Sequence, residues 1–368
     1  MTTEARRSRR IVSIDALRGF DMFWIVGGSS VCLELFTLWN TPLSLSLANQ
    51  LEHSKWNGFT FYDLIFPLFL FVVGACMPFS IAKRQEEGAS REMIYLHTIK
   101  RTIILFLLGL IVNGFLNLNF AEMRWAGVLQ RIALAYFFAV IIVMNTNIKR
   151  QVMITGGILL SYWYVMTLIV VPGSGAHVLT PAGNLAGYLD RELLPGRFCC
   201  YGYGDNEGIL STLPSISTVL LGVLSGHWIR SSRPENRKVL GLSIAGVTSL
   251  ALALVWNQVF PINKLIWSSS YVLYAGGWII LLLCLFYWLI DVRGHKKWAF
   301  PFTVIGMNAI TIYVATELFD FGIIARIFVG GFIDNLGAIK PVFWAACLLT
   351  VEWLFLYLLY RKRIFLKA

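Results

Sequence analysis

Ten apolar stretches of about twenty residues each constrain this chain more than any other feature. About 20 apolar residues in a helix cross the roughly 30 Å hydrocarbon core of a bilayer. Only helices and closed barrels satisfy every backbone hydrogen bond in lipid, so runs of this length predict transmembrane helices. We expect spans at residues 13–36, 60–82, 97–117, 124–145, 150–171, 209–230, 237–258, 269–290, 299–319 and 340–360.

The composition excludes an ordinary soluble domain. Of 368 residues, 57% are hydrophobic and 14% are charged, whereas soluble domains carry about 25% charged residues. We therefore predict an all-α polytopic membrane bundle that forms a single domain over residues 1–368. A short apolar piece at 321–333 contains Gly330-Gly331 and is too short to span, which is typical of a re-entrant or interfacial segment.

Positive charge sets the expected orientation. With the N-terminus in the cytoplasm, 22 Lys and Arg residues fall on the inner side and seven on the outer side. Cytoplasmic loops are enriched in Lys and Arg, so both termini, including the tail 1–12, are expected inside. The net charge of +11 then reflects membrane anchoring rather than nucleic-acid binding. The first apolar run follows basic residues without a small-residue cleavage site, so we expect a retained helix. The long outer loops are 37–59 and 172–208.

Polar groups inside the spans mark candidate sites, because ionisable residues in lipid usually face a cavity or a partner. At the inner end of the first span, Asp15, Arg18 and Asp21 form either an ion-pair ladder or a place where Arg18 meets an anionic ligand. The run Gly27-Gly28-Ser29-Ser30 interrupts the same span and serves helix packing or a slim ligand.

A second group of polar residues gathers near the outer side. It indicates either a polar cavity open outward or the vestibule of a channel. Its members are His53, Asn57, Asp63, Gln130, Arg131, Glu207, Asn308 and Glu317.

The six cysteines show no metal-ligand spacing, and we expect no metal site. Cys199 and Cys200 are adjacent, and adjacent cysteines are expected to bond to each other only with strain.

Several motifs, in order along nearly the whole chain, resemble the heparan-α-glucosaminide N-acetyltransferase family. Each is weak alone, and together they are specific. They are Ser13-Ile14-Asp15-Ala16-Leu17-Arg18-Gly19-Phe20, His53-Ser54-Lys55-Trp56-Asn57-Gly58, Asp63-Leu64-Ile65-Phe66-Pro67, Gly127-Val128-Leu129-Gln130-Arg131, Asp205-Asn206-Glu207-Gly208-Ile209-Leu210, Pro261-Ile262-Asn263-Lys264, Trp267-Ser268 and Gly306-Met307-Asn308-Ala309.

The resemblance implies a transmembrane acetyltransferase with a helical membrane core and a tendency to dimerise. Acetyl-CoA is taken from the cytoplasm, and the acetyl group goes to the amine of a glucosamine-type sugar on the opposite side. The chain looks like a compact bacterial member without the large luminal domain of the animal enzyme, and is expected in the bacterial inner membrane. The family's active histidine falls on His53. Animal members carry an asparagine eleven residues after the arginine of the Arg-Gly pair, where this chain has the shorter Ser29.

Acetyl transfer to an amine needs a neutral nitrogen, an aligned thioester and donors for the oxyanion. A histidine suits proton acceptance near neutral pH, so we expect His53 to be the general base or, alternatively, an acetyl carrier. Asp63 is expected to orient the imidazole, and Asn57, Ser29 or a backbone N–H to supply the oxyanion donor.

The remaining candidates divide between the two substrates. For acetyl-CoA we expect Arg18, Gly27, Gly28, Gln130 and Arg131, although Arg131 pairing with Glu207 is an equal alternative. For the acceptor we expect Trp56, Glu207, Asn308 and Glu317. The alternative role for Trp56 is to anchor the chain at the membrane interface.

Two other functions remain open from the residues. One is a permease for aminosugars or N-acetylated sugars, and the other is an acyl-binding or assembly factor in envelope polysaccharide modification. Transporters often show inverted repeats and paired broken helices. The sequence shows one clear small-residue break and no repeat, which favours the enzyme.

Overall fold

The computed structural model describes residues 11–172 and 178–365. Within these ranges all regular structure is helical, and β pairing is limited to isolated bridges. The all-α prediction is therefore confirmed. The helices divide into two compact units. The described part of the first comprises Ser54–Phe59 and Phe66–Cys284, and that of the second comprises Ile11–His53, Thr60–Ile65 and residues 285–365.

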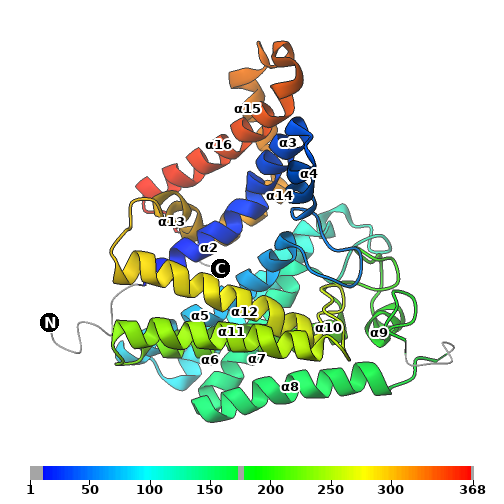
Figure 1. The fold of residues 1–368 in the computed structure, drawn as a ribbon, viewed down its shortest axis with the longest axis vertical. Helices are drawn as coiled ribbons and strands as arrows, with labels where there is room; N and C mark the ends of the chain where they lie inside the picture. Colours follow the sequence, from blue (N-terminus) through cyan, green and yellow to red (C-terminus); the bar gives the residue numbers. More distant parts are fainter. Residues whose placement is uncertain (1–10, 173–177, 366–368) are drawn as a thin grey trace. The chain divides into compact units, whose positions relative to one another are not determined.

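The first unit holds six membrane-length helices and one short loop helix (Figure 1). They are α5 (Ile65–Glu86), α6 (Arg91–Val112), α7 (Val128–Asn145), α8 (Ile148–Leu168), α10 (Ile209–Arg230), α11 (Glu235–Trp256) and, in the long loop before α10, the short α9 (Leu185–Leu193). The helix α12 (Ser269–Phe286) also lies almost wholly in this unit and continues into a π-helical turn, η4 (Tyr287–Val292).

Helices α5 and α10 form the core of the first unit. Two thirds of the membrane-length window is buried in each (67%), against 28% or less in α6, α8 and α11. Glycines let the two backbones touch: a Cβ on Gly222 would lie 2.0 Å from the Phe71 carbonyl oxygen, and one on Gly74 would lie 1.9 Å from that of Val219. Small residues four apart, here Gly222 and Gly226, commonly allow such contact between membrane helices.

Side-chain caps move the ends of two spans from their expected places. The span expected at 97–117 is α6 (Arg91–Val112), because the Met93 N–H donates to Ser90 Oγ over 3.2 Å and starts the helix early. The span expected at 124–145 begins at Val128, because Asn113 Nδ2 donates to the carbonyls of Arg124 and Ala126 and holds that segment outside the helix.

In the second unit, the first span is continuous but irregular. Helix α2 (Val12–Phe23) passes through a π-helical turn, η1 (Trp24–Gly28), into α3 (Ser29–Trp39). The expected interruption at the glycines is therefore a local irregularity, with non-helical dihedrals at Gly27. Helix α2 packs closely on α13 (Phe300–Met307): a Cβ on Gly306 would lie 2.1 Å from the Asp15 carbonyl oxygen.

The span expected at 299–319 is broken. Helix α13 ends at Met307, α14 (Ala309–Leu318) follows, and the two are bent by 71°. The bend falls at Asn308, which has non-helical dihedrals of −129° and 36°. The described residues thus contain nine helices long enough to cross a membrane, or ten if this pair counts as one span. The ten expected spans are therefore found only if α13 and α14 together count as one bent span.

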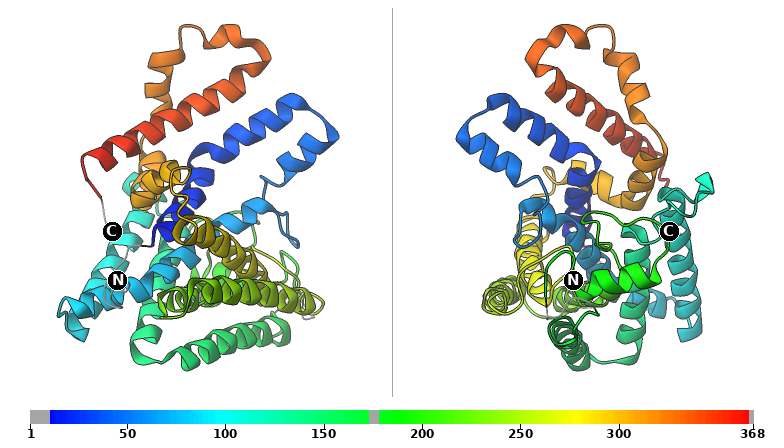
Figure 2. Two further views of the ribbon diagram at one scale, coloured as in Figure 1. Left: turned by 60° about the vertical axis from the view of Figure 1, so that its left-hand side comes forward. Right: turned by 90° about the vertical axis from the view of Figure 1, so that its right-hand side faces the viewer.

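Two helical hairpins complete the second unit (Figure 2). One joins α3 to α4 (Pro42–Asn49), which starts with a capping box between Thr41 and Ser44. The other joins α15 (Phe321–Val329) through the 3-10 segment η5 (Ile333–Ile339) to α16 (Lys340–Arg361). The apolar piece expected at 321–333 therefore contains one short helix.

Candidate active site

His53 and Asp63 meet in the second unit. His53 Nδ1 lies 2.9 Å from Asp63 Oδ1. The Asp63 side chain is fully buried, whereas the His53 side chain is half exposed (50%). A buried carboxylate thus holds one nitrogen of an imidazole whose ring remains accessible.

Local sequence fixes the position of Asp63. Thr60 is the N-cap of a 3-10 turn, η2 (Phe61–Leu64), that leads into α5. The other carboxylate oxygen of Asp63 accepts the Thr60 backbone N–H at 3.2 Å and lies 3.2 Å from the Thr60 hydroxyl, so the two residues form a capping box. The His53 ring packs beside Tyr62 with centroids 4.9 Å apart. Both oxygens of Asp63 therefore have defined partners before any substrate arrives.

Trp56 and Asn57, from the same motif, belong to the first unit. Trp56 Nε1 donates to the Leu179 carbonyl oxygen at 2.9 Å. Asn57 Oδ1 accepts from Asn263 Nδ2 at 3.1 Å, which joins two of the motifs found in the sequence. The side-chain amide of Asn57 lies on an exposed residue and keeps its own NH₂ available as a donor.

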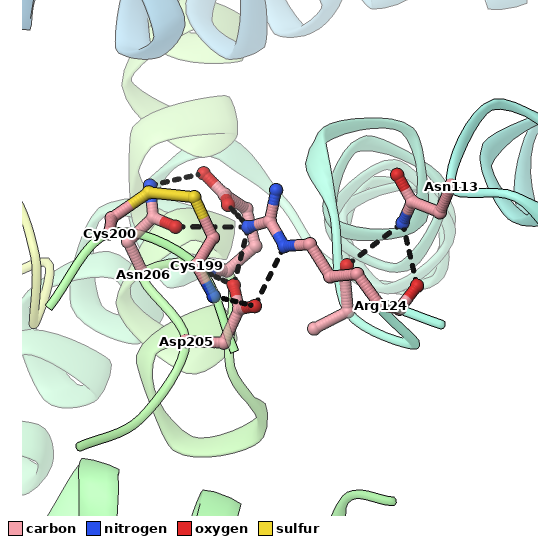
Figure 3. Close-up of a disulfide and its surroundings, with 8 residues drawn as sticks. Asn113, Arg124, Cys199, Cys200, Asp205 and Asn206 are labelled. Atoms are coloured by element: carbon pink, nitrogen blue, oxygen red, sulfur yellow. Dashed lines mark hydrogen bonds and ion pairs between the residues drawn. A yellow bond between two sulfur atoms is a disulfide. The ribbon is translucent and has the colours of Figure 1, made fainter. Parts of the chain in front are cut away.

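Arg124 and Asp205 form a buried ion network just before α10 (Figure 3). Glu207 belongs to the same network through its ion pair with Arg124. Arg124 donates to Asp205 through Nε at 2.7 Å and through Nη2 at 2.5 Å, and Nη2 also contacts Asn206 and Glu207. Burial lowers the pKa of Arg124, but its bonds to Asp205 and Glu207 outweigh burial and raise it above the ordinary value. Arg124 thus stays charged and forms ion pairs with both carboxylates.

Asp190, on α9, shapes the turn that leads into α10. Its two oxygens accept the backbone N–H groups of Asp205 at 3.1 Å and Ile209 at 2.9 Å. Burial raises the pKa of Asp190 to about 6, although both hydrogen bonds oppose the rise. The sequence motifs did not predict this role for Asp190, because its hydrogen-bond partners lie 15 and 19 positions away.

Arg131 is buried on α7, and among the described residues its hydrogen-bond partner is Ser211 rather than Glu207, which pairs with Arg124. Its Nη2 donates to Ser211 Oγ, and its guanidinium lies 4.8 Å from the centre of the Trp267 ring. Among the described residues, its Nε and Nη1 have no hydrogen-bond partner, and neither has the buried amide of Gln130. Buried polar groups are normally hydrogen-bonded, so this pair has donors to spare for a ligand.

The first-span candidates lie in the second unit. Arg18 Nη1 donates to Asp15 Oδ1 at 3.4 Å and to the Gly306 carbonyl oxygen at 3.3 Å. Ser29 Oγ donates to the Trp24 carbonyl oxygen at 2.8 Å, inside the irregular turn that holds Gly27 and Gly28. The hydroxyl of Ser29 is therefore engaged with its own helix.

The last two residues expected to bind the acceptor, Asn308 and Glu317, differ in their surroundings. Asn308 is buried at the bend between α13 and α14, and its Nδ2 donates to the Ile364 carbonyl oxygen at 3.1 Å. Glu317 is exposed near the end of α14.

Two further buried carboxylates, Asp21 and Glu352, lie outside the residues predicted to bind the substrates or to catalyse the reaction. Asp21 is fully buried, and neither of its oxygens has a hydrogen-bond partner among the described residues, so it is not part of an ion-pair ladder with Arg18. Glu352, on α16, is 3% exposed, and its Oε2 lies 3.6 Å from where a Cβ on Gly27 would be. Its position inside an apolar span is the signal that would have found it.

Comparisons with known proteins agree with the motifs. Residues 10–162 match a domain family of unknown function, DUF5009. The chain is 30% identical to human heparan-alpha-glucosaminide N-acetyltransferase and 29% identical to the mouse protein of that name. Each alignment covers 73% of this chain and 49% of the relative, so the chain spans about half the length of the curated relatives it matches. The resemblance read from the motifs is confirmed: this polytopic membrane protein is related in sequence to the heparan-alpha-glucosaminide N-acetyltransferase family.

Proposed function

We propose that this chain is a transmembrane acetyltransferase. It moves the acetyl group of cytoplasmic acetyl-CoA to the amine of a glucosamine-type acceptor on the periplasmic side. The observation that carries the proposal is the hydrogen bond between an accessible His53 and a buried Asp63, within residues 10–162 that match the DUF5009 family.

The pair supports a proton-transfer role for His53. A carboxylate accepts hydrogen bonds and donates none, so Asp63 selects the tautomer with the proton on Nδ1. Nε2 then carries the lone pair that accepts a proton from the acceptor's ammonium or attacking amine. The amine nitrogen bonds to the acetyl carbon, the sulfur of coenzyme A leaves, and the imidazolium is stabilised by Asp63.

The remaining candidates for the oxyanion and the acceptor come from both units, and each is proposed from its motif and from contacts within its own unit. Asn57 holds its carbonyl on Asn263 and so presents its NH₂ as a donor for the carbonyl oxygen of the acetyl group. Trp56 offers an aromatic face to a sugar ring, and the Glu207 network, Asn308 and Glu317 offer acceptors for hydroxyl groups. Ser29 is the weaker oxyanion candidate, because its hydroxyl already donates to Trp24.

Unpartnered donors support the assignment of acetyl-CoA residues. Gln130 and Arg131 are buried with amide and guanidinium groups to spare, which suits a pantetheine amide or a carbonyl oxygen. Arg18, at the inner end of the first span, suits a phosphate. Gly27 and Gly28 stay candidates for the side of the pantetheine arm, although a Cβ on Gly28 would lie 2.3 Å from the Phe23 ring and one on Gly27 3.5 Å from Leu349, so these side chains border the proposed path.

The same proposal includes location and assembly. We place the chain in the bacterial inner membrane with both termini cytoplasmic, from the 22-to-7 distribution of Lys and Arg, and we expect a homodimer. Reporter fusions at the C-terminus and within 178–208 test the orientation, and light scattering of the purified protein in detergent tests the dimer.

Labelled acetyl-CoA and glucosamine, supplied to the detergent-solubilised protein, test the activity. Label is expected in the sugar, and His53→Ala should abolish it. His295→Ala is the matched control, because His295 is an exposed histidine outside the site. Arg18→Ala should raise the KM for acetyl-CoA and recover at high acetyl-CoA. Release of coenzyme A without acceptor, at one equivalent per chain, would assign His53 as an acetyl carrier rather than a base.

A permease for aminosugars is the second candidate, and one observation favours it. The bend at Asn308 adds a second broken helix to the irregular first span, and broken helices are frequent in transporters. Sugar uptake into vesicles without acetyl transfer, unchanged in His53→Ala, would replace the enzyme with the permease.

A further inference from the structure

A disulfide joins the adjacent residues Cys199 and Cys200 in the loop that precedes α10 (Figure 3). Cys200 is exposed, so a small thiol reagent has access to the bond. The other described cysteines, Cys32, Cys76, Cys284 and Cys347, are not joined in disulfides. Because these four cysteines lie outside the loop, the thiols of Cys199 and Cys200 can be distinguished from theirs by chemical labelling.

The bonded pair is fastened to the buried ion network. The Cys199 N–H donates to Asp205 Oδ2 at 3.1 Å, and Cys200 forms a backbone bridge with Asp205. Asp205 is in turn held by both nitrogens of the Arg124 fork. The cysteines therefore connect an exposed loop to a buried, charged anchor.

The next residue in the chain contacts the candidate site segment. The ring of Tyr201 lies 5.3 Å from the ring of Trp56, centroid to centroid. Trp56 is itself held by its bond to Leu179 and is followed by Asn57, the proposed oxyanion donor. The disulfide is thus one residue away from a side chain that packs on the motif.

The ring that the disulfide closes contains the backbone between Cys199 and Cys200. Cys200 has a φ of 83°, in the left-handed region that non-glycine residues seldom adopt. The covalent ring includes the peptide bond between the two cysteines, so it restricts the backbone of Cys200 directly. Opening the ring lets Cys200 move toward an ordinary negative φ, and this redirects the chain at Tyr201.

We propose that Cys199–Cys200 is a redox modification site that controls acetyl transfer by keeping Tyr201 packed on Trp56. The partner is a dithiol reductant, such as a dithiol protein on the same side of the membrane. One thiolate of the dithiol attacks the sulfur of Cys200 and forms a mixed disulfide, and Cys199 leaves as a thiolate that takes up a proton. The second thiolate then displaces Cys200. The dithiol loses two electrons and two protons to become a disulfide, and the chain gains both as two thiols.

The expected size of the effect follows from the aromatic pair. Contacts of this kind change an equilibrium by about two- to tenfold. Reduction should therefore lower kcat/KM for acetyl transfer by about the same factor, while His53 and Asp63 remain in place. The expected change in acetyl transfer rests on the proposed function, whereas the expected loop movement does not.

The experiment treats the purified full chain with dithiothreitol under nitrogen and removes the reagent before acetyl-CoA is added, because free thiols attack thioesters. Mass spectrometry after maleimide labelling counts the thiols, and phenylarsine oxide traps the adjacent pair. Trypsin cleavage at the exposed Arg197 reports the order of the loop. The double variant C199S/C200S is the control: it should resemble the reduced wild type without treatment and should not respond to dithiothreitol.

The proposal is supported by two new thiols, faster cleavage at Arg197 and lower acetyl transfer in the wild type alone. It is overturned if the folded chain does not yield the two thiols, or if they appear while cleavage or transfer stays unchanged. If the oxidised chain transfers no acetyl group at all, the proposed function fails instead, and the labelling and cleavage results still decide whether the disulfide holds the loop.

Discussion

Replacing Asp63 by asparagine removes one negative charge and leaves a single side-chain oxygen, which can accept a hydrogen bond from either His53 or Thr60. In the native protein, one oxygen faces His53 Nδ1 at 2.9 Å and the other faces the Thr60 N–H at 3.2 Å. Asparagine has one oxygen and one NH₂ group, so it can accept from only one of these donors.

The two orientations of the new amide have different consequences. With its oxygen on Thr60, the NH₂ group faces His53 Nδ1 and selects the tautomer that carries its proton on Nε2, which cannot act as the base. With its oxygen on His53, the NH₂ group opposes the Thr60 N–H in a buried place. An unsatisfied buried donor costs about 1–3 kcal/mol, so the inactive tautomer should outnumber the active one by about five- to 150-fold.

The loss of charge adds to the tautomer effect. The imidazolium formed during transfer no longer has a carboxylate beside it. Replacement of the buried carboxylate in a comparable histidine pair lowers kcat by about 10⁴. We therefore expect Asp63→Asn to lower kcat by about 10²–10⁴, with little change in KM for acetyl-CoA.

The assay is single-turnover and steady-state acetyl transfer with Asp63→Asn, His53→Ala and the double variant. The double variant should be no slower than His53→Ala, because residues that act as a unit lose function together. Thermal unfolding in detergent checks that the variants fold. A folded Asp63→Asn protein with kcat within about threefold of the wild type would refute the reasoning, since a tautomer error of this size must be visible.

Other expectations concern stability. Gly222→Leu should lower the unfolding free energy by about 1–3 kcal/mol through overpacking against α5, whereas Gly157→Ala on α8, where a Cβ meets nothing within 4 Å, should be neutral or stabilising in the same thermal assay. Arg124→Gln leaves two buried carboxylates unpaired and should cost about 3–5 kcal/mol, more than Glu207→Gln. The pKa of Asp190 is raised to about 6 in the folded protein, so its protonated form stabilises the fold. This stabilisation, about 3 kcal/mol, is complete below the unfolded-state pKa near 4 and is lost as pH rises through 6. The Tm of the wild type should therefore fall between pH 4.5 and 7 more steeply than that of Asp190→Asn, and parallel curves would contradict this.

The spans were predictable because length and apolarity are local properties of the sequence. Their ends were less so, since α6 starts at a cap made by Ser90 and the start of α7 depends on Asn113, whose amide reaches carbonyls 11 and 13 positions away. The bend at Asn308 has no glycine or proline at its break, so composition gave no warning of it.

The candidate site shows the same division between local and distant information. His53 and Asp63 are ten residues apart and were expected to meet, and the capping box at Thr60 makes that possible. The partner of Glu207 is Arg124, 83 positions earlier, and nothing in the sequence distinguishes it from Arg131 as the counter-ion. Long-range pairing of buried charges is set by tertiary packing, which motif spacing does not report.

The division of the motif between two units allows the proposed roles to be separated. His53 and Asp63 lie in one unit and their hydrogen bond is complete there, whereas Asn57 and its partner Asn263 lie in the other. Because the pair does not depend on Asn57, Asn57→Ala should lower kcat through the lost oxyanion donor, by about 10²–10³, and leave the pH profile governed by His53 unchanged. A shifted profile in Asn57→Ala would show instead that Asn57 acts through the imidazole, and the oxyanion role would then pass to a backbone N–H.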